Sequence, residues 1–185
     1  MAPSSLAILF FALLALAPSG TSDPIAAAPR ENDDQAISGR MERPWSILQF
    51  YMHDQTSGSN PTTAFVTTPQ INNDTYFGVV AVFDDLLTRS PSIQSARVGR
   101  MRGMFTFDSL SALSLLQSAT VEIFGRAGSI SLHGQNPFLD PQRELAVIGG
   151  SGEFRCARGY ATVSTVGNEP GGLVLFWNIF YRLDC

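Results

Sequence analysis

The sequence predicts an all-β protein. Short runs rich in aromatic and β-branched residues follow one another from Trp45 to the C-terminus, and residues that favour turns separate them. Helical periodicity is nearly absent, since only residues 111–119, SALSLLQSA, could form a helix. Eight or nine strands at this spacing are typical of an antiparallel sandwich or barrel.

Segments such as SGSNP (57–61) and PQINND (69–74) provide turns between the predicted strands. In chain order the strands are SILQFYMHD (46–54), TAFVTT (63–68), YFGVVAVFDD (76–85), RVGRMRGMFTFD (97–108), ALSLLQSATVEIFG (112–125), SISLHG (129–134), RELAVIGG (143–150), EFRCARGYATVSTV (153–166) and GLVLFWNIFYRLD (172–184).

The last of these strands is apolar on both faces. One face carries Leu173, Leu175, Trp177, Ile179 and Tyr181, and the other carries Val174, Phe176 and Phe180. In a lone small barrel the outer face would meet water, so a second apolar face favours burial against a partner, and we expect a homo-oligomer. A loop or helix packed over this face is the alternative.

The N-terminal part has the features of a secreted protein. Residues 4–18 form an apolar run that is too short to span a membrane, and small residues follow, so residues 1–22 are interpreted as a signal peptide. Residues 23–44 are polar and contain proline, which predicts a flexible N-terminal arm before the domain at 45–185. Asn73 begins a glycosylation sequon in a turn-rich segment. We therefore expect a secreted, soluble glycoprotein.

Charge and composition exclude several classes of protein. The formal net charge is −4 without a basic block, so nucleic acid is not an expected partner. All 12 basic residues are arginine, and the absence of lysine excludes Schiff-base chemistry and a Walker A loop. The two histidines, His53 and His133, lack a spaced second ligand, so we expect no metal site, and no G-x-S-x-G elbow accompanies them. His53 is interpreted as a structural strand residue.

The segment GGSGEFRCARG (149–159) combines glycines with two arginines, as a phosphate-binding loop would. A phosphate loop lies between a strand and a helix, whose N-terminus faces the anion. Here strand-like runs lie on both sides, so the glycines are expected to form a turn between two strands.

Acidic residues within the apolar strands are candidates for proton transfer. Asp54 shares the strand parity of Phe50 and Met52 and is expected to point the same way, where burial would raise its pKa and suit general acid catalysis. Asp84 and Asp85 are expected to lie in water at the end of their strand.

Four motifs, in this order, resemble those of the plant dirigent protein family. They are FYMHD (50–54), YFGVVAVFDDLLT (76–88), VGRMRGMF (98–105) and RELAVIGGSGEFRCARGYA (143–161). The last motif contains GGSGEFRCARG, which is similar to the family signature GGTGxFxxARG. The resemblance extends from about Leu48 to Asp184, which is essentially the whole predicted domain.

The resemblance implies an eight-stranded antiparallel β-barrel that is secreted to the apoplast, glycosylated, homotrimeric and free of metal or redox cofactors. The best-understood members bind phenoxy radicals made by a separate oxidase, a laccase or peroxidase, and direct their coupling to one stereoisomer in lignan biosynthesis, as with coniferyl alcohol and pinoresinol. Other members handle quinone methides, or dehydrate and cyclise an isoflavanol to a pterocarpan. The expected function is stereocontrol of phenylpropanoid coupling. The alternatives are a dehydratase or cyclase and a non-catalytic, defence-related binding barrel.

The site residues of the family match this sequence in part. The acid of the family's HD motif matches Asp54 and its pocket arginine matches Arg143, so the resemblance implies catalytic roles for both. Lignan-forming members carry an aspartate seven residues before this arginine, whereas this chain has Asn136, which can hydrogen-bond a substrate but cannot deliver a proton. Asp140, three residues before Arg143, is the alternative acid. This departure speaks against pinoresinol-type coupling.

The cysteines also depart from the family pattern. Cys156 and Cys185 are the only two in the chain and could form one disulfide. Lignan-type members pair an N-terminal cysteine with one that matches Cys185, but the arm here has no cysteine. Relatives often have an apolar residue at the position of Cys156, so the resemblance implies a buried thiol there rather than a bond to Cys185.

Overall fold

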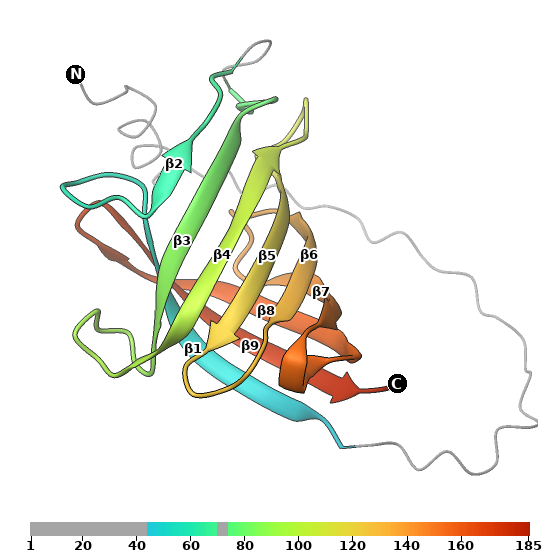
Figure 1. The fold of residues 1–185 in the computed structure, drawn as a ribbon. Coiled ribbons are helices and arrows are strands. Elements are labelled where there is room, and N and C mark those ends of the chain that lie inside the picture. The colour runs from blue at the N-terminus through green and yellow to red at the C-terminus, as the bar shows by residue number, and fades with distance from the viewer. Residues whose placement is uncertain (1–43, 70–73) are drawn as a thin grey trace, which may run out of the picture. The chain divides into compact units, whose positions relative to one another are not determined.

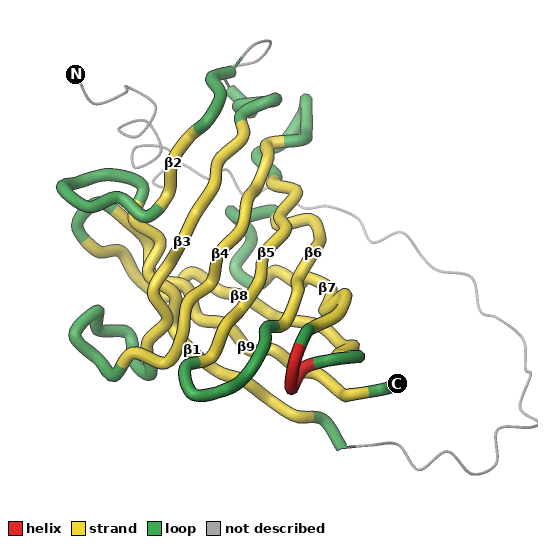
Figure 2. The backbone as a smooth tube through the Cα atoms, in the orientation of Figure 1, coloured by secondary structure: helices red, strands yellow, loops and turns green. Residues whose placement is uncertain are grey.

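Nine β-strands and one 3-10 helix form the part of the chain that the computed structural model describes, residues 44–69 and 74–185 (Figures 1 and 2). Trp45–Cys185 is a compact unit. The predicted signal peptide, nearly all of the predicted arm and the sequon at Asn73 lie outside the described residues. The elements are β1 (Ser46–Gln55), β2 (Thr63–Phe65), β3 (Val80–Thr88), β4 (Arg97–Phe107), β5 (Leu115–Ile123), β6 (Ile130–Asn136), β7 (Arg143–Gly150), η1 (Gly152–Phe154), β8 (Ala157–Glu169) and β9 (Gly172–Leu183).

The sheet closes on itself through β1. From β3 to β9 each strand pairs antiparallel with the next, and β9 pairs with β1 along its whole length. β1 also pairs with β3 through Tyr51–Thr88, Met52–Leu87 and His53–Leu86, which completes a ring of eight strands. The short β2 continues the β1 edge of β3, where Thr63 lies opposite Phe83. The prediction of an eight-stranded antiparallel barrel is confirmed, and the sandwich is not formed.

The second half of the segment that could have formed a helix, residues 115–119, lies in the strand β5. β5 has a period of two, with Leu115, Ala119 and Val121 buried and Ser118 and Thr120 exposed between them. This alternation matches a sheet with one face on a core rather than a helical stripe.

The glycine-rich connection between β7 and β8 is a turn, as predicted. It contains the single-turn helix η1, drawn in red in Figure 2. Gly152 has φ +57°, and a Cβ there would lie 2.4 Å from the Ala127 carbonyl oxygen, so only glycine fits. The Arg158 guanidinium donates to the Ile148 carbonyl oxygen across the same strand pair, which is a structural contact rather than an anion site.

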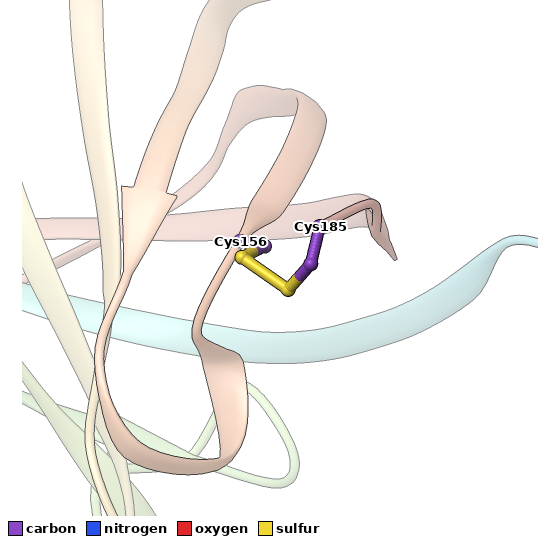
Figure 3. The surroundings of a disulfide bond; sticks show 2 residues. All are labelled: Cys156 and Cys185. Carbon is purple, nitrogen blue, oxygen red and sulfur yellow. A yellow bond between two sulfur atoms is a disulfide. The ribbon is translucent and has the colours of Figure 1, made fainter.

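A disulfide joins Cys156 to Cys185, so the expectation of a buried Cys156 thiol is wrong (Figure 3). Cys156 immediately precedes β8 and Cys185 follows β9. Because Ala157 lies opposite Leu183 in that antiparallel pair, the two cysteines come to a Cα–Cα distance of 5.2 Å. The bond ties the C-terminal end of the chain to the turn between β7 and β8.

Aromatic rings from neighbouring strands partly cover the outer face of β9. Phe176 packs on Tyr51 with ring centroids 4.9 Å apart, and Phe180 stacks on Tyr160 at 4.8 Å. Trp45, which contacts Tyr160, remains 44% exposed. The expected homo-oligomer therefore stays a prediction, with an aromatic outer surface as its candidate contact.

The barrel interior is apolar at one end and polar at the other. At one end of the barrel, β6 and β8 begin and β5 and β9 terminate, because neighbouring strands are antiparallel. Fully buried apolar side chains fill this apolar end: Val121, Ile130, Phe154, Ala157 and Ile179. The opposite end gathers the C-terminal ends of β1 and β6 with the beginnings of β5 and β7. We call it the polar end because Asp54, Gln117, Asn136 and Arg143 lie there.

Candidate functional site

Asp54 lies at the polar end with one polar partner holding it. It follows Phe50 and Met52 on the inner face of β1, both of which are buried, and is itself half-buried. Its Oδ1 accepts a hydrogen bond of 2.7 Å from the Thr63 hydroxyl on β2. Burial raises the pKa of Asp54, while the bond from Thr63 acts in the opposite direction. The Thr63 hydroxyl thus fixes the orientation of the Asp54 carboxyl.

Asp85 is a second buried carboxyl beside Asp54, and the expectation that it lies in water is wrong. β3 continues past it to Thr88, so Asp85 points inward like Phe83 and is 0% exposed. Its Oδ1 accepts a hydrogen bond of 2.5 Å from the Thr62 hydroxyl. Burial, and then the charge of Asp54, raise the pKa of Asp85 to about 9. We call Asp54 and Asp85 the acidic pair.

Asp84 points to the outside of the barrel, as expected for a solvent-facing acid. Its Oδ1 lies 2.6 Å from Arg100 Nε in a half-exposed ion pair on the outer face of β3 and β4. Consecutive strand residues face opposite sides, so two adjacent aspartates within one strand necessarily divide between water and core. This parity was the signal that could have identified Asp85.

Arg143 begins β7 and is buried at the polar end, with 4% of its surface exposed. Its Nη1 donates to the carbonyl oxygens of Phe138 at 3.3 Å and Asp140 at 3.2 Å, and to the Thr165 hydroxyl at 3.0 Å. Its Nε has no partner within the described residues. Burial lowers the pKa of Arg143. The guanidinium is therefore held on one side and retains a free donor for a bound oxygen.

Asn136 ends β6 and is hydrogen-bonded to a second buried amide. Its Nδ2 donates to Gln117 Oε1 at 2.7 Å, and its own Oδ1 has no partner among the residues described. We call Asn136, Gln117 and Arg143 the amide–arginine group. Asp140 is exposed in the turn between β6 and β7 and reaches Arg143 through its backbone oxygen, which does not favour it as the missing acid.

A row of aromatic rings lies between the two polar groups. β4 runs between β3, which carries Asp85, and β5, which carries Gln117, and Phe105 lies directly opposite Gln117. The Phe105 ring is 6.3 Å from that of Phe83 and 6.0 Å from that of Phe107. Such rings offer flat apolar surfaces for stacking an aromatic ligand.

The structure thus assembles two polar groups at one end of the barrel. Within the described part of the chain no hydrogen bond or ion pair links Asp54 to Arg143, so the predicted site residues form two separate clusters. Three buried polar atoms in them lack partners there: Asp85 Oδ2, Asn136 Oδ1 and Arg143 Nε. Unpaired buried polar atoms cost stability, and a bound ligand with phenolic and hydroxyl oxygens would satisfy them.

His53 has a structural setting, as expected. It lies on the outer face of β1 and is 1% exposed, with Nδ1 2.9 Å from Glu169 Oε1 and Nε2 2.8 Å from the Thr88 hydroxyl. It therefore does not share the interior with Asp54.

Other kinds of site find little support in residues 44–69 and 74–185. No cluster there of three or more His, Cys, Asp or Glu side chains is arranged to hold a metal ion. Nor does that part contain a helix with the length and apolarity to cross a membrane. A surface cleft of about 350 Å³ lies at the apolar end, between residues 122–129 and Ser151.

Comparison with known proteins agrees with this architecture. The family model described as "Dirigent-like protein" matches residues 46–181. Dirigent protein 21 of Arabidopsis thaliana is 38% identical over 141 residues, which cover 72% of this chain and 74% of that protein. Pterocarpan synthase 1 of Glycyrrhiza echinata is 30% identical over 164 residues, covering 84% and 87%.

Solved structures give the same result. A pterocarpan synthase dirigent protein superposes with a TM-score of 0.69 at 29% identity, covering 84% of this chain and 98% of that one. The residues that the family model matches, 46–181, run from β1 into β9 and include both polar groups and the glycine-rich turn. The chain is a member of the dirigent protein family.

Proposed function

We propose that the chain is a secreted dirigent protein that binds phenylpropanoid-derived radicals or quinone methides and imposes stereoselectivity on their coupling. The observation that carries this proposal is the polar end itself, where an acidic pair and an amide–arginine group lie on either side of phenylalanine rings. In this proposal a separate laccase or peroxidase makes the radicals.

Binding and proton transfer would be divided between the two groups. The rings of Phe83, Phe105 and Phe107 would hold the aromatic rings of the substrate and limit the faces that can meet. Arg143 and Asn136 would orient phenolic oxygens through their unpaired donor and acceptor. Asp54 would move a proton during ring closure after coupling.

The remaining features of the proposal concern the mature protein. We propose removal of residues 1–22 as a signal peptide, a flexible arm at 23–44, the barrel domain at 45–185, glycosylation at Asn73 and secretion to the apoplast. The proposed homotrimer would bury the aromatic outer surface of β9 and β1, where Trp45 and Ile47 are exposed.

Chiral product analysis tests the function. Coniferyl alcohol is oxidised by laccase with and without the protein, and the dimers are separated by chiral chromatography. The proposal expects an enantiomeric excess that increases with the amount of protein. An unchanged racemic mixture would exclude stereocontrol of this substrate.

A second candidate is a dehydratase or cyclase that needs no oxidase. Two observations favour it, the 30% identity to a pterocarpan synthase and the asparagine where lignan-forming members have an aspartate. Incubation with an isoflavanol alone, followed by chromatography, separates the candidates, since only a cyclase forms a pterocarpan without laccase. Binding of both phenols without any turnover would favour a non-catalytic, defence-related binding barrel.

A further inference from the structure

Asp85 is a buried carboxyl to which the family resemblance assigns no role. It is 0% exposed on the inner face of β3, between Phe83 and Leu87, where an aspartate is expected only with a specific partner or purpose. Lignan-forming members have an aspartate at the position of Asn136, so this chain has one acidic group fewer in the site. Asp85 is the buried acid that lies beside Asp54.

The register of β1 and β3 brings the two carboxyls together. Met52 lies opposite Leu87 and His53 opposite Leu86, and Asp54 and Asp85 are the next residues along the two strands beyond this last pair. Their proximity is also seen in the charge of Asp54, which raises the pKa of Asp85. Two consecutive threonines orient these carboxyls. The Thr62 hydroxyl donates to Asp85 Oδ1 at 2.5 Å, and the Thr63 hydroxyl donates to Asp54 Oδ1 at 2.7 Å.

The charges around Asp85 favour its neutral form. Asp54 on β1 and Asp84 on its own strand oppose a negative charge, and Arg100 on β4, already paired with Asp84, offsets this only in part. With a pKa of about 9, Asp85 carries a proton at neutral pH. Thr62 donates to Oδ1, so the proton resides on Oδ2, which has no partner among the described residues. A buried, unpartnered O–H group is thereby available to a ligand.

We propose that Asp85 is the second acid of the site and that it donates its Oδ2 proton to an oxygen of the bound substrate while Asp54 accepts one. This inference rests on the proposed function. In ring closure on a quinone methide, a substrate hydroxyl forms a C–O bond to the exocyclic carbon and its proton passes to the Asp54 carboxylate. The electron pair of the C=C bond moves into the ring, and the former carbonyl oxygen takes the proton of Asp85.

The acidic pair thus holds one proton before and after this step, and no oxidant is required. Proton transfer from Asp54 back to Asp85 restores the starting state, which their adjacent positions favour. The same exchange would serve loss of a hydroxyl as water, with Asp85 as the donor to the leaving oxygen.

Infrared spectroscopy and kinetics test the proposal with Asp85→Asn and the matched control Asp84→Asn, which changes the neighbouring residue on the outer face. At pH 7 the wild-type protein and D84N are expected to show the carbonyl band of a protonated carboxylic acid, and D85N is expected to lack it. In whichever of the two assays above the wild type is active, D85N should lose at least about tenfold in the rate of ring closure with unchanged substrate affinity.

Each result has one meaning. A band that persists in D85N, or D85N activity equal to that of D84N, overturns the role of Asp85 and leaves the proposed function intact. A wild-type protein that is inactive in both assays contradicts the proposed function instead, and the infrared band then decides the protonation of Asp85 by itself. Asp85→Leu replaces D85N if the asparagine variant does not fold.

Discussion

His53 Nδ1 lies 2.9 Å from Glu169 Oε1, a contact that joins the C-terminal part of β1 to the last residue of β8. The ring's Nε2 faces the Thr88 hydroxyl at 2.8 Å, and that hydroxyl donates its own hydrogen to the Ser90 carbonyl oxygen at 2.7 Å. Both ring nitrogens therefore have a polar partner within hydrogen-bond distance, which fixes the orientation of the buried ring. The contact between His53 and Glu169 is a largely buried link on the outer face of β1.

Removing the charge of Glu169 should weaken this link. Glu169→Gln is expected to lower the free energy of unfolding by about 1–3 kcal/mol, because a buried donor loses its charged acceptor. Urea unfolding measures the change. Glu144→Gln is the control, since Glu144 is exposed on β7, and an equal loss in both variants would contradict the account.

Loss of the disulfide should destabilise the barrel without altering its strands. Cys156 and Cys185 are separated by 29 positions, and a loop of this length corresponds to roughly 3–4 kcal/mol in the chain-entropy description. The double variant Cys156→Ser with Cys185→Ser, compared with reduced wild type, should show a lower melting temperature and an unchanged far-ultraviolet circular dichroism spectrum. Equal stability of oxidised wild type and the double variant would contradict this prediction.

Asp85 should make stability fall as the pH rises. Between its ordinary pKa of 3.8 and its folded value of about 9, the folded chain holds a proton that the unfolded chain has released, so raising the pH in this window favours unfolding. Asp85→Asn removes this dependence. The change that it makes in the free energy of unfolding should therefore be more stabilising at pH 7 than at pH 3, by up to about 4 kcal/mol.

Chemical denaturation at several pH values measures this difference. Asp84→Asn, at a half-exposed ion pair, should change stability by less than about 1 kcal/mol over the same range. A stabilisation by D85N that is the same at pH 3 and pH 7 would show that Asp85 does not carry the dependence.

Arg143→Lys should impair binding more than folding. Lysine has one terminal nitrogen, whereas the guanidinium contacts Thr165 and two backbone oxygens through Nη1 and keeps a separate Nε donor free. We expect at least about a tenfold loss of affinity for a phenolic ligand, measured by calorimetry. Arg155→Lys changes an exposed arginine of the glycine-rich turn and should bind as wild type does. Equal affinities in the two variants would remove Arg143 from the site.

Strand alternation made most of the barrel predictable from sequence. Turn residues separate runs of period two, and only the closure through β1, which pairs with both β3 and β9, depended on contacts between strands that are not consecutive in the sequence. The inward direction of Asp54 followed from the parity of Phe50 and Met52, which the structure shows as buried.

The missed features depend on where strands end and how they pair. Asp85 was expected in water because β3 was taken to end there, whereas it continues to Thr88 and turns one aspartate inward. The disulfide was missed because the register of β8 and β9, which brings Cys156 to Cys185, is a property of the folded hairpin. The register of this hairpin is not visible in residue types alone, whereas the parity of Asp84 and Asp85 is.

The central claim is that a phenolic ligand binds at the polar end of the barrel, between the acidic pair and the amide–arginine group. A crystal structure of the protein soaked with coniferyl alcohol, without an oxidase, tests it most directly. The account predicts a ligand whose ring contacts Phe105 and whose oxygens lie within hydrogen-bond distance of Asp85 Oδ2, Asn136 Oδ1 or Arg143 Nε. A ligand bound instead in the cleft beside Ser151 at the apolar end would contradict it.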